Sequence, residues 1–451
     1  MPCSFYITAA HKSSGKTVVS LGISAALNER SLKVQTFKKG PDYIDPIWLS
    51  QASGKPCYNL DFFNMSSDDI VGLYSSNASK SDVNIIEGNK GLYDGISPTG
   101  GDANADLAKL LNVPVILVID VTGITRGIAP LLTGYQEFDK GVNIAGVIFN
   151  NVAGDRHELK LTQATNHYTD IPILGSIRRS NELVIDERHL GLMPANEATE
   201  SQRFIDRAAK HIANQVDLEQ IITLNQQVVQ STAPVVSTTK KSLTVAVAKD
   251  SAFGFYYQDD IDAFKLQGVD LVFFNTLTDA KIPQSDALFI GGGFPEMQLE
   301  ALSANTPLLN DIKTKIEQGL PAYAECGGMM YLSRQITYKG ESHKMVGVIE
   351  ADTLMTSKPI GRGYVKLSPT DKHPWNGVAE QIYAHEFHYS KLENIDPKTH
   401  YAYEVLRGVG VDNKCDGILN YNLLATYTHL RSVGGNNWVE QFVNFIKDKL
   451  S

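Results

Sequence analysis

Lys16 and Thr17, near the N-terminus, have the types and the spacing needed to hold a nucleoside triphosphate. They end the segment Thr8-Ala-Ala-His-Lys-Ser-Ser-Gly-Lys-Thr17, which follows a short apolar run and precedes a helical pattern. In a phosphate-binding loop, backbone amides surround the phosphates, a lysine neutralises their outer oxygens and a hydroxyl holds Mg²⁺. Ala10 stands where such a loop usually begins with glycine, so the strand and helix around the segment carry the prediction of nucleotide binding.

Acidic residues that follow two further apolar segments could hold a metal ion. Glu87 comes directly after the run at residues 83–86, and an acid at a strand end downstream of a phosphate-binding loop completes Mg²⁺ coordination. Asp42 and Asp45 lie in a loop bounded by glycine and proline after residues 33–37. These two acids could serve a metal or a substrate, or they could be solvated side chains of an ordinary turn.

Cys326 is the candidate nucleophile of the second half of the chain. It follows a strand-like segment at residues 321–325 and precedes Gly327 and Gly328, a pattern that predicts a strand, a sharp turn and a helix that begins at the sulfur. The helix dipole should lower the thiol pKa, and the amide of Gly327 could help to bind an oxyanion. A buried structural cysteine is the alternative interpretation.

A cysteine nucleophile needs a histidine that takes its proton and returns it. The chain offers His385-Glu-Phe-His388, whose histidines could simply cap or hydrogen-bond within a loop, and His429, which ends a strand-like segment. We expect His429 to face Cys326 across the carboxyl end of the sheet. The glycines at residues 291–293 could turn backbone amides toward a developing negative charge, or they could form only a tight turn.

The strands and helices that must position these residues predict an α/β protein with two parallel-sheet domains. Near-continuous apolar runs alternate with helical stretches, as in parallel sheets covered on both faces. Ligands bind such sheets at the carboxyl ends of the strands, which is where the first half places Lys16, Asp42, Asp45, Glu87 and Asn150. A polar stretch at residues 214–241 separates the halves, so we place the domains at residues 1–236 and 237–451.

Composition and charge restrict the partners of the chain. Its 451 residues exceed one ordinary core, and a net charge of −9 without a basic run argues against nucleic acid as a partner. The longest apolar run, at residues 113–119, is far too short to cross a membrane, and the N-terminus lacks the core of a signal peptide. Four cysteines without a CxxC pattern suit a reducing cytoplasm. We therefore expect a cytoplasmic protein with small-molecule ligands.

Eight short motifs occur in order along nearly the whole chain: GPDYIDP, EGNKGLYDG, ERHLGL, AKDSAFGFYYQDD, GGGFPE, AECGGMMYL, HEFHYS and ATYTHL. Together they resemble the cobyrinic acid a,c-diamide synthase family. The resemblance implies a dethiobiotin-synthetase-like P-loop domain, followed by a class I glutamine amidotransferase domain of the kind that lacks the usual triad carboxylate. It implies a carbon–nitrogen ligase of cobalamin biosynthesis, which uses ATP and glutamine to amidate the a and c acetate carboxylates of cobyrinate through acyl phosphates.

The resemblance also implies a role for each residue at a matching motif position in the first domain. The nucleotide would be bound by Ser14, Gly15, Lys16, Thr17 and Asn150, with Asn150 at the adenine. Mg²⁺ would be held by Thr17, Asp45 and Glu87. Lys38 would stabilise charge on the transferring phosphoryl group, and Asp42 would lie on the substrate side.

In the second domain, the resemblance implies that Cys326 attacks the glutamine carboxamide and that His429 serves as its base. Gly292 and Gly327 would form the oxyanion hole. In ordinary class I domains a glutamate two residues after that histidine orients it, whereas this chain has Arg431 there. The group that fixes His429 is therefore left open.

The implied small-molecule partners are an acidic tetrapyrrole, L-glutamine and ATP, with Mg²⁺ as cofactor, and the resemblance allows a homodimer. Candidate cations for the acidic groups of the tetrapyrrole are Arg178, Arg179, Arg188 and His189. The pair Asn89-Lys90 stands where relatives commonly have two hydrophobic residues, close to the expected substrate carboxylates. Cobyrinate is the first candidate substrate, and a sirohaem-type or nickel-sirohydrochlorin tetrapyrrole is the second.

A nucleotide switch of the partition or septum-positioning type is the rival from another functional class. Its P-loop sheet is similar, but it needs no cysteine–histidine site and typically carries a basic amphipathic end. This chain instead has Cys326, His429 and a terminal segment of mixed charge. The pattern therefore favours an amidotransferase.

Overall fold

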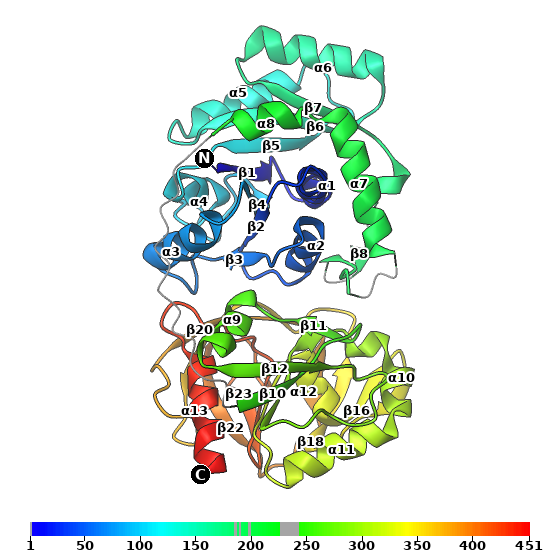
Figure 1. Cartoon of the computed structure of the whole chain (residues 1–451), viewed down its shortest axis with the longest axis vertical. Coiled ribbons are helices and arrows are strands. Elements are labelled where there is room, and N and C mark those ends of the chain that lie inside the picture. The colour runs from blue at the N-terminus through cyan, green and yellow to red at the C-terminus, as the bar shows by residue number, and fades with distance from the viewer. Residues whose placement is uncertain (1, 185–186, 189–190, 197–199, 226–242) are drawn as a thin grey trace. The chain divides into compact units, whose positions relative to one another are not determined.

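The computed structural model describes residues 2–184, 187–188, 191–196, 200–225 and 243–451. The chain divides into two compact units, Met1–Pro234 and Val235–Ser451, each built around its own sheet (Figure 1). The predicted domain boundary between residues 236 and 237 lies outside the described residues and stays a prediction. In the part of the chain that is described, no helix combines the length and the apolar character that crossing a bilayer requires.

Seven parallel strands form the sheet of the first unit: β1 (Cys3–Ala9), β2 (Val34–Lys39), β3 (Tyr58–Leu60), β4 (Val83–Gly91), β5 (Val115–Asp120), β6 (Ile144–Val152) and β7 (Ile173–Arg178). Their order is β3-β2-β4-β1-β5-β6-β7. Strands β1 and β5 are buried along almost their whole length, which explains their near-continuous apolar sequences. A 3₁₀ turn, η1 (Asn181–Leu183), and a hairpin of β8 (Glu187–Arg188) and β9 (Gly191–Leu192) follow β7.

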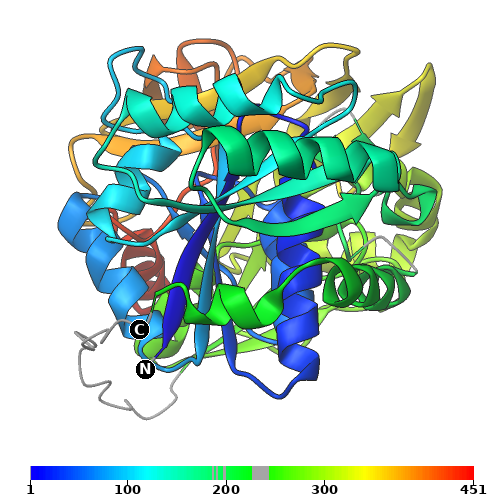
Figure 2. The ribbon, with the colours of Figure 1, turned by 90° about the horizontal axis from the view of Figure 1, so that it is seen from above.

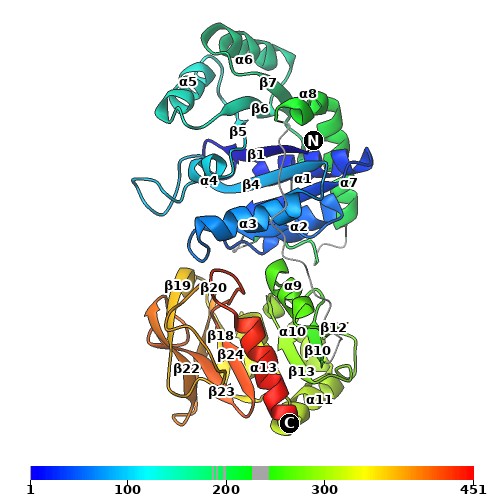
Figure 3. The same cartoon turned by 60° about the vertical axis from the view of Figure 1, so that its left-hand side comes forward.

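Helices cover both faces of this sheet (Figure 3). One face carries α1 (Lys16–Glu29), α2 (Ile44–Ser53) and α7 (Ser201–Gln215), and α8 (Leu218–Thr223) adds to their core. The other carries α3 (Ser67–Ala78), α4 (Asn104–Leu110) and α5 (Ile128–Phe138), with α6 (Asp155–Tyr168) beside α5. Helix α1 runs alongside β1 (Figure 2). Gly22 lets α1 approach α7 closely, because a Cβ atom there would overlap Ile212.

The second unit has a nine-stranded sheet in which five neighbouring strands are parallel. These are, in spatial order, β12 (Val269–Phe274), β10 (Leu243–Ala248), β13 (Ala287–Ile290), β15 (Ala322–Glu325) and β24 (Leu423–Thr426). The sheet continues with antiparallel pairs through β23 (Cys415–Asn420), β22 (His400–Arg407), β19 (Gly361–Pro369) and β20 (Ile382–His388). The predicted α/β class is confirmed, but the sequence pattern does not predict this antiparallel extension.

Two apolar cores lie against this second sheet. One includes α10 (Leu299–Ala304), α11 (Thr306–Glu317) and α12 (Gly327–Leu332), and the other includes α9 (Gln258–Leu266) and the C-terminal helix α13 (Trp438–Leu450), red in Figure 3. Trp438 is fully buried, with its ring centroid 4.7 Å from that of Tyr323. The smaller elements are β11 (Phe253–Phe255), β14 (Gly292–Gly293), η2 (Pro295–Met297), β16 (Ser333–Tyr338), β17 (Glu341–Lys344), β18 (Ile349–Met355) and β21 (Ser390–Glu393).

Candidate active site

The loop between β1 and α1 has the geometry of a phosphate-binding loop. Helix α1 begins at Lys16, directly after Gly15, whose φ of 84° is left-handed. Asn150, from β6, donates from Nδ2 to the Ser14 carbonyl at 3.0 Å, and a Cβ atom on Gly15 would overlap that nitrogen. Position 15 therefore requires glycine, and the structure brings these four predicted nucleotide-binding residues together.

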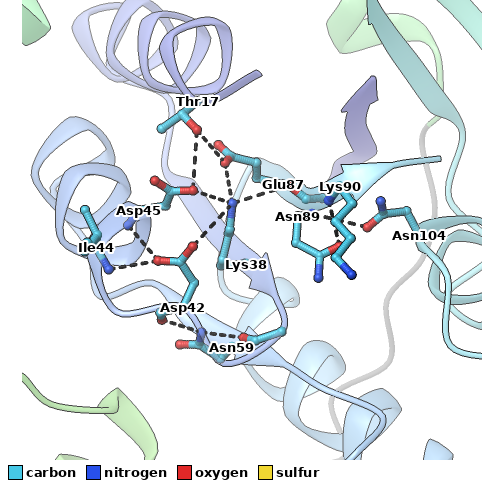
Figure 4. Close-up of polar contacts among 12 residues, drawn as sticks. Thr17, Lys38, Asp42, Ile44, Asp45, Asn59, Glu87, Asn89, Lys90 and Asn104 are labelled. Carbon is cyan, nitrogen blue, oxygen red and sulfur yellow. Dashed lines mark hydrogen bonds and ion pairs between the residues drawn. The ribbon is translucent and has the colours of Figure 1, made fainter. Parts of the chain in front are cut away.

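Lys38 links the acids predicted to hold a metal (Figure 4). Its Nζ lies 2.5 Å from Asp45 Oδ2 and 2.6 Å from Glu87 Oε1. The Thr17 hydroxyl donates to Glu87 Oε1 at 3.0 Å and lies 3.4 Å from Asp45 Oδ2. Asp42 Oδ2 lies 4.0 Å from Nζ, while its Oδ1 accepts from the first two amides of α2. We call this group the Lys38 cluster.

The strand register explains the Lys38 cluster. Lys38 in β2 is paired with Glu87 in β4, so the two side chains start from neighbouring positions on the sheet. Both strands extend beyond the predicted segments at residues 33–37 and 83–86, and Lys38 and Glu87 therefore lie inside strands and not after them. Both side chains are almost completely buried.

Charges in the Lys38 cluster shift one another's pKa values. Burial opposes the charge of Lys38, but Asp45 and Glu87 raise its pKa well above the usual value. Burial also opposes the charge of Asp45, yet Lys38 holds the pKa of Asp45 below its usual value. Burial raises the pKa of Glu87, and it raises that of Asp42 to about 7. In the adjoining loop, burial and then Lys38 lower the pKa of Lys16 to about 8.

The donor set fits a hard divalent cation. Thr17 offers a hydroxyl, and Asp45 and Glu87 offer carboxylate oxygens, which are the ligand types that Mg²⁺ prefers. Among the described residues, no group of three or more His, Cys, Asp and Glu side chains could hold a metal by itself. Phosphate oxygens of a nucleotide would therefore have to complete the coordination, as they do in P-loop enzymes.

Cys326 occupies a sharp turn between β15 and α12. Its φ of 44° and ψ of −100° are unusual for a residue with a side chain, and such strain is concentrated at functional sites. Its amide donates to the Thr426 carbonyl at 2.7 Å, which fastens the turn to β24. Burial raises the pKa of the thiol, while the Gly327 amide acts in the opposite direction. The expected lowering of this pKa is therefore wrong, because desolvation outweighs a helix of only six residues.

His429 follows β24 and is paired through its backbone with His385. The His429 amide donates to the His385 carbonyl at 2.8 Å. Burial lowers the pKa of His429 to about 3, and His388 acts in the same direction, so the imidazole is neutral and can accept a proton. His385 and His388 lie in β20, so the alternative that they belong to a loop is wrong.

Two glycines join the histidine to the cysteine turn. A Cβ atom on Gly292 would lie 2.5 Å from His429 Cε1. A Cβ atom on Gly327 would lie 3.0 Å from both the nitrogen and the carbonyl oxygen of Gly293. The backbone of β14 therefore contacts both the imidazole and the turn that follows Cys326. The structure thus places Gly292 beside His429 and Gly327 beside Gly293, and the catalytic roles of Cys326 and His429 stay predictions.

Two family models match the chain. The CobQ/CobB/MinD/ParA nucleotide binding domain matches residues 6–192, and the CobB/CobQ-like glutamine amidotransferase domain matches residues 244–436. A cobyrinate a,c-diamide synthase from Magnetococcus marinus is 42% identical to this chain over an alignment 455 residues long, gaps included. The alignment covers 98% of this chain and 97% of that protein. The chain belongs to the cobyrinate a,c-diamide synthase family.

Other members of the cobyrinate a,c-diamide synthase family match over a similar span. The protein from Caldanaerobacter subterraneus is 36% identical and that from Picrophilus torridus is 39% identical, and the matches cover 98% of this chain and 97% and 98% of the relatives. Membership confirms the resemblance and makes the chain a glutamine-dependent ligase with a nucleotide-binding half. A partition-type switch does not explain the amidotransferase domain.

Glu325 lies beside His429, although the motifs do not predict this contact. Its Oε2 lies 3.3 Å from Nδ1 of His429. The sequence shows a glutamate just before the cysteine in the AECGG segment. Its contact with His429 cannot be predicted from that segment, because it depends on β15 and β24 being neighbouring strands. Arg431, at the position of the usual triad carboxylate, forms an ion pair with Asp259 instead.

The cations predicted to bind the tetrapyrrole are only partly described. Arg178 forms ion pairs of 2.5 and 2.6 Å with two acids of α6, so its charge is already matched within the unit. Arg179 donates to a threonine hydroxyl at 3.1 Å. His189 lies outside the described residues, as does the side chain of Arg188. The role of this group in binding a substrate stays a prediction.

Proposed function

We propose that the protein is a cobyrinate a,c-diamide synthase, which uses ATP, Mg²⁺ and glutamine to amidate the a and c acetate carboxylates of cobyrinate. The observation that carries the proposal is the similarity over both halves to proteins of that name. The two sites support it, because each half of the reaction finds the residue types that its chemistry needs. A cytoplasmic location and a homodimer stay predictions.

Activation of the acid is assigned to the first unit. A carboxylate is a poor acyl donor because it is anionic, so transfer of the γ-phosphoryl group to it, with release of ADP, makes a reactive acyl phosphate. Lys16 and Lys38 would neutralise charge on the transferring group. Thr17, Asp45 and Glu87 would hold Mg²⁺, which neutralises phosphate charge when it is bound.

Release of ammonia is assigned to the second unit. His429 takes the thiol proton of Cys326, and the sulfur attacks the side-chain carbonyl carbon of glutamine. The amides of Gly292 and Gly327 would bind the resulting oxyanion. His429 then gives the proton to the leaving nitrogen, which departs as ammonia, and water hydrolyses the thioester to glutamate. Ammonia finally displaces phosphate from the acyl phosphate and leaves an amide.

A sirohaem-type or nickel-sirohydrochlorin tetrapyrrole is the second candidate substrate. The observation that favours it is the polar pair Asn89 and Lys90, which continues β4 beyond Glu87. Figure 4 shows both residues beside the Lys38 cluster. Lys90 is exposed, so its ammonium is available to an acidic group of a macrocycle.

A panel of tetrapyrroles incubated with ATP, Mg²⁺ and glutamine, followed by mass spectrometry, tests the proposal. Two carboxyl groups of cobyrinate should be converted to amides one after the other, and omission of ATP should prevent both conversions. Amidation of a sirohaem-type or nickel-bearing macrocycle, with none on cobyrinate, would transfer the assignment to the second candidate. No amide on any member of the panel would overturn the proposed function.

A further inference from the structure

Arg431 stands where class I amidotransferase domains carry the carboxylate that orients the histidine, but its side chain is directed to α9. Its Nε and Nη2 lie 2.8 and 2.7 Å from Asp259 Oδ2. The guanidinium also lies over the Tyr257 ring, 5.0 Å from the ring centroid. Because a guanidinium has no acceptor, Arg431 cannot receive the Nδ1 hydrogen of His429. The orienting role is therefore open to another group.

Glu325 reaches His429 from the residue just before the nucleophile. Its Oε2 lies 3.3 Å from Nδ1, and each of the two side chains is only 4% exposed. The contact follows from the topology, because β15 and β24 are neighbouring parallel strands with Glu325 paired with Thr426. Residues that follow these strands meet at the same edge of the sheet. In such a dry site, a hydrogen bond between carboxylate and imidazole is stronger than in water.

The Glu325 carboxylate is itself held in place. Its Oε1 accepts from the Tyr323 hydroxyl at 2.8 Å and from the Leu430 amide at 2.9 Å. Tyr323 precedes Glu325 by two residues on β15, so the two side chains lie on the same face of the sheet. Leu430 follows His429, so one carboxylate contacts both the ring of the histidine and the backbone next to it. This arrangement directs Oε2 toward Nδ1.

Other ionisable side chains interact electrostatically with His429, and they form hydrogen bonds with backbone groups away from its imidazole ring. The carboxylates of Asp416 and Glu386 accept hydrogen bonds from backbone amides. His388 Nδ1 lies 2.8 Å from a backbone carbonyl, and His385 is paired with His429 through the main chain. These groups contribute charge or packing near the imidazole, but the hydrogen bonds described above do not involve the ring of His429.

We propose that Glu325 is the positioning residue of the glutaminase site: it accepts the Nδ1 hydrogen of His429, so that Nε2 can take the thiol proton of Cys326. The inference rests on the proposed hydrolysis of glutamine. The carboxylate also stabilises the imidazolium that forms when the proton moves. Glu325 gains no proton in the cycle, because the proton passes from sulfur to Nε2 and from Nε2 to the leaving ammonia.

Alkylation of Cys326 as a function of pH tests this role without any substrate. Wild type and Glu325→Gln are treated with iodoacetamide, and mass spectrometry of the Cys326 peptide separates it from the other cysteines. The substitution should slow alkylation at least ~10-fold above about pH 8, where Glu325 of the wild type is ionised, because the imidazolium beside the thiolate loses its carboxylate partner. Glutaminase kcat should fall by about 10²-fold with KM for glutamine within about threefold, since the side chain keeps its shape.

Two further variants make the test decisive. Asp260→Asn is the matched control, because Asp260 is another buried carboxylate of this unit and bonds to the Ser432 amide and the Trp438 indole. It should lower Tm but change the alkylation profile less than Glu325→Gln does, because Asp260 acts on Glu325 through its charge and makes no hydrogen bond to it. Tyr323→Phe removes one hydrogen-bond donor to Oε1 of Glu325. It tests the same role if Glu325→Gln does not fold. It should lower kcat by about fivefold at unchanged KM.

The outcomes separate this inference from the proposed function. A wild-type alkylation profile and kcat in Glu325→Gln, or in Tyr323→Phe where the first variant does not fold, would overturn the role of Glu325. Synthesis from added ammonium should stay at the wild-type rate in both variants, and its loss would assign the residue a structural role instead. A wild-type protein that forms no amide from either nitrogen source would overturn the proposed function, while the alkylation result would still decide the role of Glu325.

Discussion

At the scale of residues, both sites depend on backbone positions that admit no side chain or that strain one. Gly15 lies so close to Asn150, and Gly292 so close to His429, that a Cβ atom on either glycine would overlap that side chain. Cys326 is held at a φ of 44°. Strain of this kind persists only where the surrounding structure over-determines the conformation. The glycines in these motifs are therefore geometric requirements of the sites.

Gly292→Ala should disable glutamine hydrolysis. The new methyl group would lie 2.5 Å from His429 Cε1, and a displacement of the base by about 1 Å can cost ~10²-fold in rate. Glutaminase kcat, measured by ammonia release, should fall ~10 to 100-fold, while synthesis from ammonium persists. Gly134→Ala, at an open position on α5, is the matched control. Full glutaminase activity in Gly292→Ala would contradict the placement of the imidazole.

Glutaminase activity should rise as the pH is raised through about 8. Burial raises the pKa of Glu325 to about 8, and burial lowers that of His429 to about 3. Below the first value the carboxyl keeps its proton and lacks the negative charge that stabilises the imidazolium, whereas above it the carboxylate supplies that charge. A pH profile of kcat/KM for ammonia release checks the direction. Activity that falls over this range, or a rise that persists in Glu325→Gln, would count against the assignment.

Motif spacing predicts the first-unit site well at this scale. Lys16, Thr17, Asp45 and Glu87 lie together because the carboxyl ends of parallel strands meet at one edge of a sheet. The thiol pKa of Cys326 could not be predicted in the same way, because the decisive effect is burial by residues distant in the chain. The role of Glu325 likewise depends on which strands are neighbours.

At the scale of elements, the parallel strands could be predicted and the antiparallel extension could not. In β20, the inward positions are Ile382, Ala384, Glu386 and His388. Two of these four are polar, so the alternation of apolar and polar residues that identifies a strand is hidden. This is the physical reason why the sequence leaves a loop open as an alternative for His385 and His388.

Asp259→Asn should destabilise the second unit strongly. The ion pair between Asp259 of α9 and Arg431 after β24 is buried, with side chains 5% and 1% exposed. Removing one partner leaves the other charge uncompensated, which costs about 3–5 kcal/mol. Urea unfolding of this unit measures the loss. Glu317→Gln, which breaks an exposed pair with Lys313, should cost less than about 1 kcal/mol. Equal effects of the two substitutions would contradict the role given to the buried pair.

At the scale of the whole molecule, one polypeptide carries a site suited to activating an acid and a site suited to releasing ammonia. Ammonia in water is largely protonated and then has no lone pair for attack on an acyl group. We therefore expect that release and use of ammonia by the same chain would limit this loss. The relative from Magnetococcus marinus matches both halves in one chain as well.

Lys16→Ala should remove synthesis from both nitrogen sources and leave glutamine hydrolysis in place. Lys16 is buried at the start of α1, where its charge would face the phosphates. Amide formation should fall at least ~10²-fold with glutamine or with ammonium. Lys140→Ala, at an exposed lysine paired with Glu137, is the matched control. Retained synthesis in Lys16→Ala would dismiss the phosphate-binding assignment.

Transfer of the glutamine nitrogen into the tetrapyrrole tests whether one chain releases ammonia from glutamine and attaches it to the activated acid. Wild type and Cys326→Ser are given ATP, Mg²⁺, cobyrinate, unlabelled ammonium and glutamine that carries heavy nitrogen in its side-chain amide, and the products are weighed by mass spectrometry. We expect labelled amides at two carboxylates with wild type and only unlabelled amides with Cys326→Ser. Labelled amides from Cys326→Ser, or no amide from wild type, would contradict it.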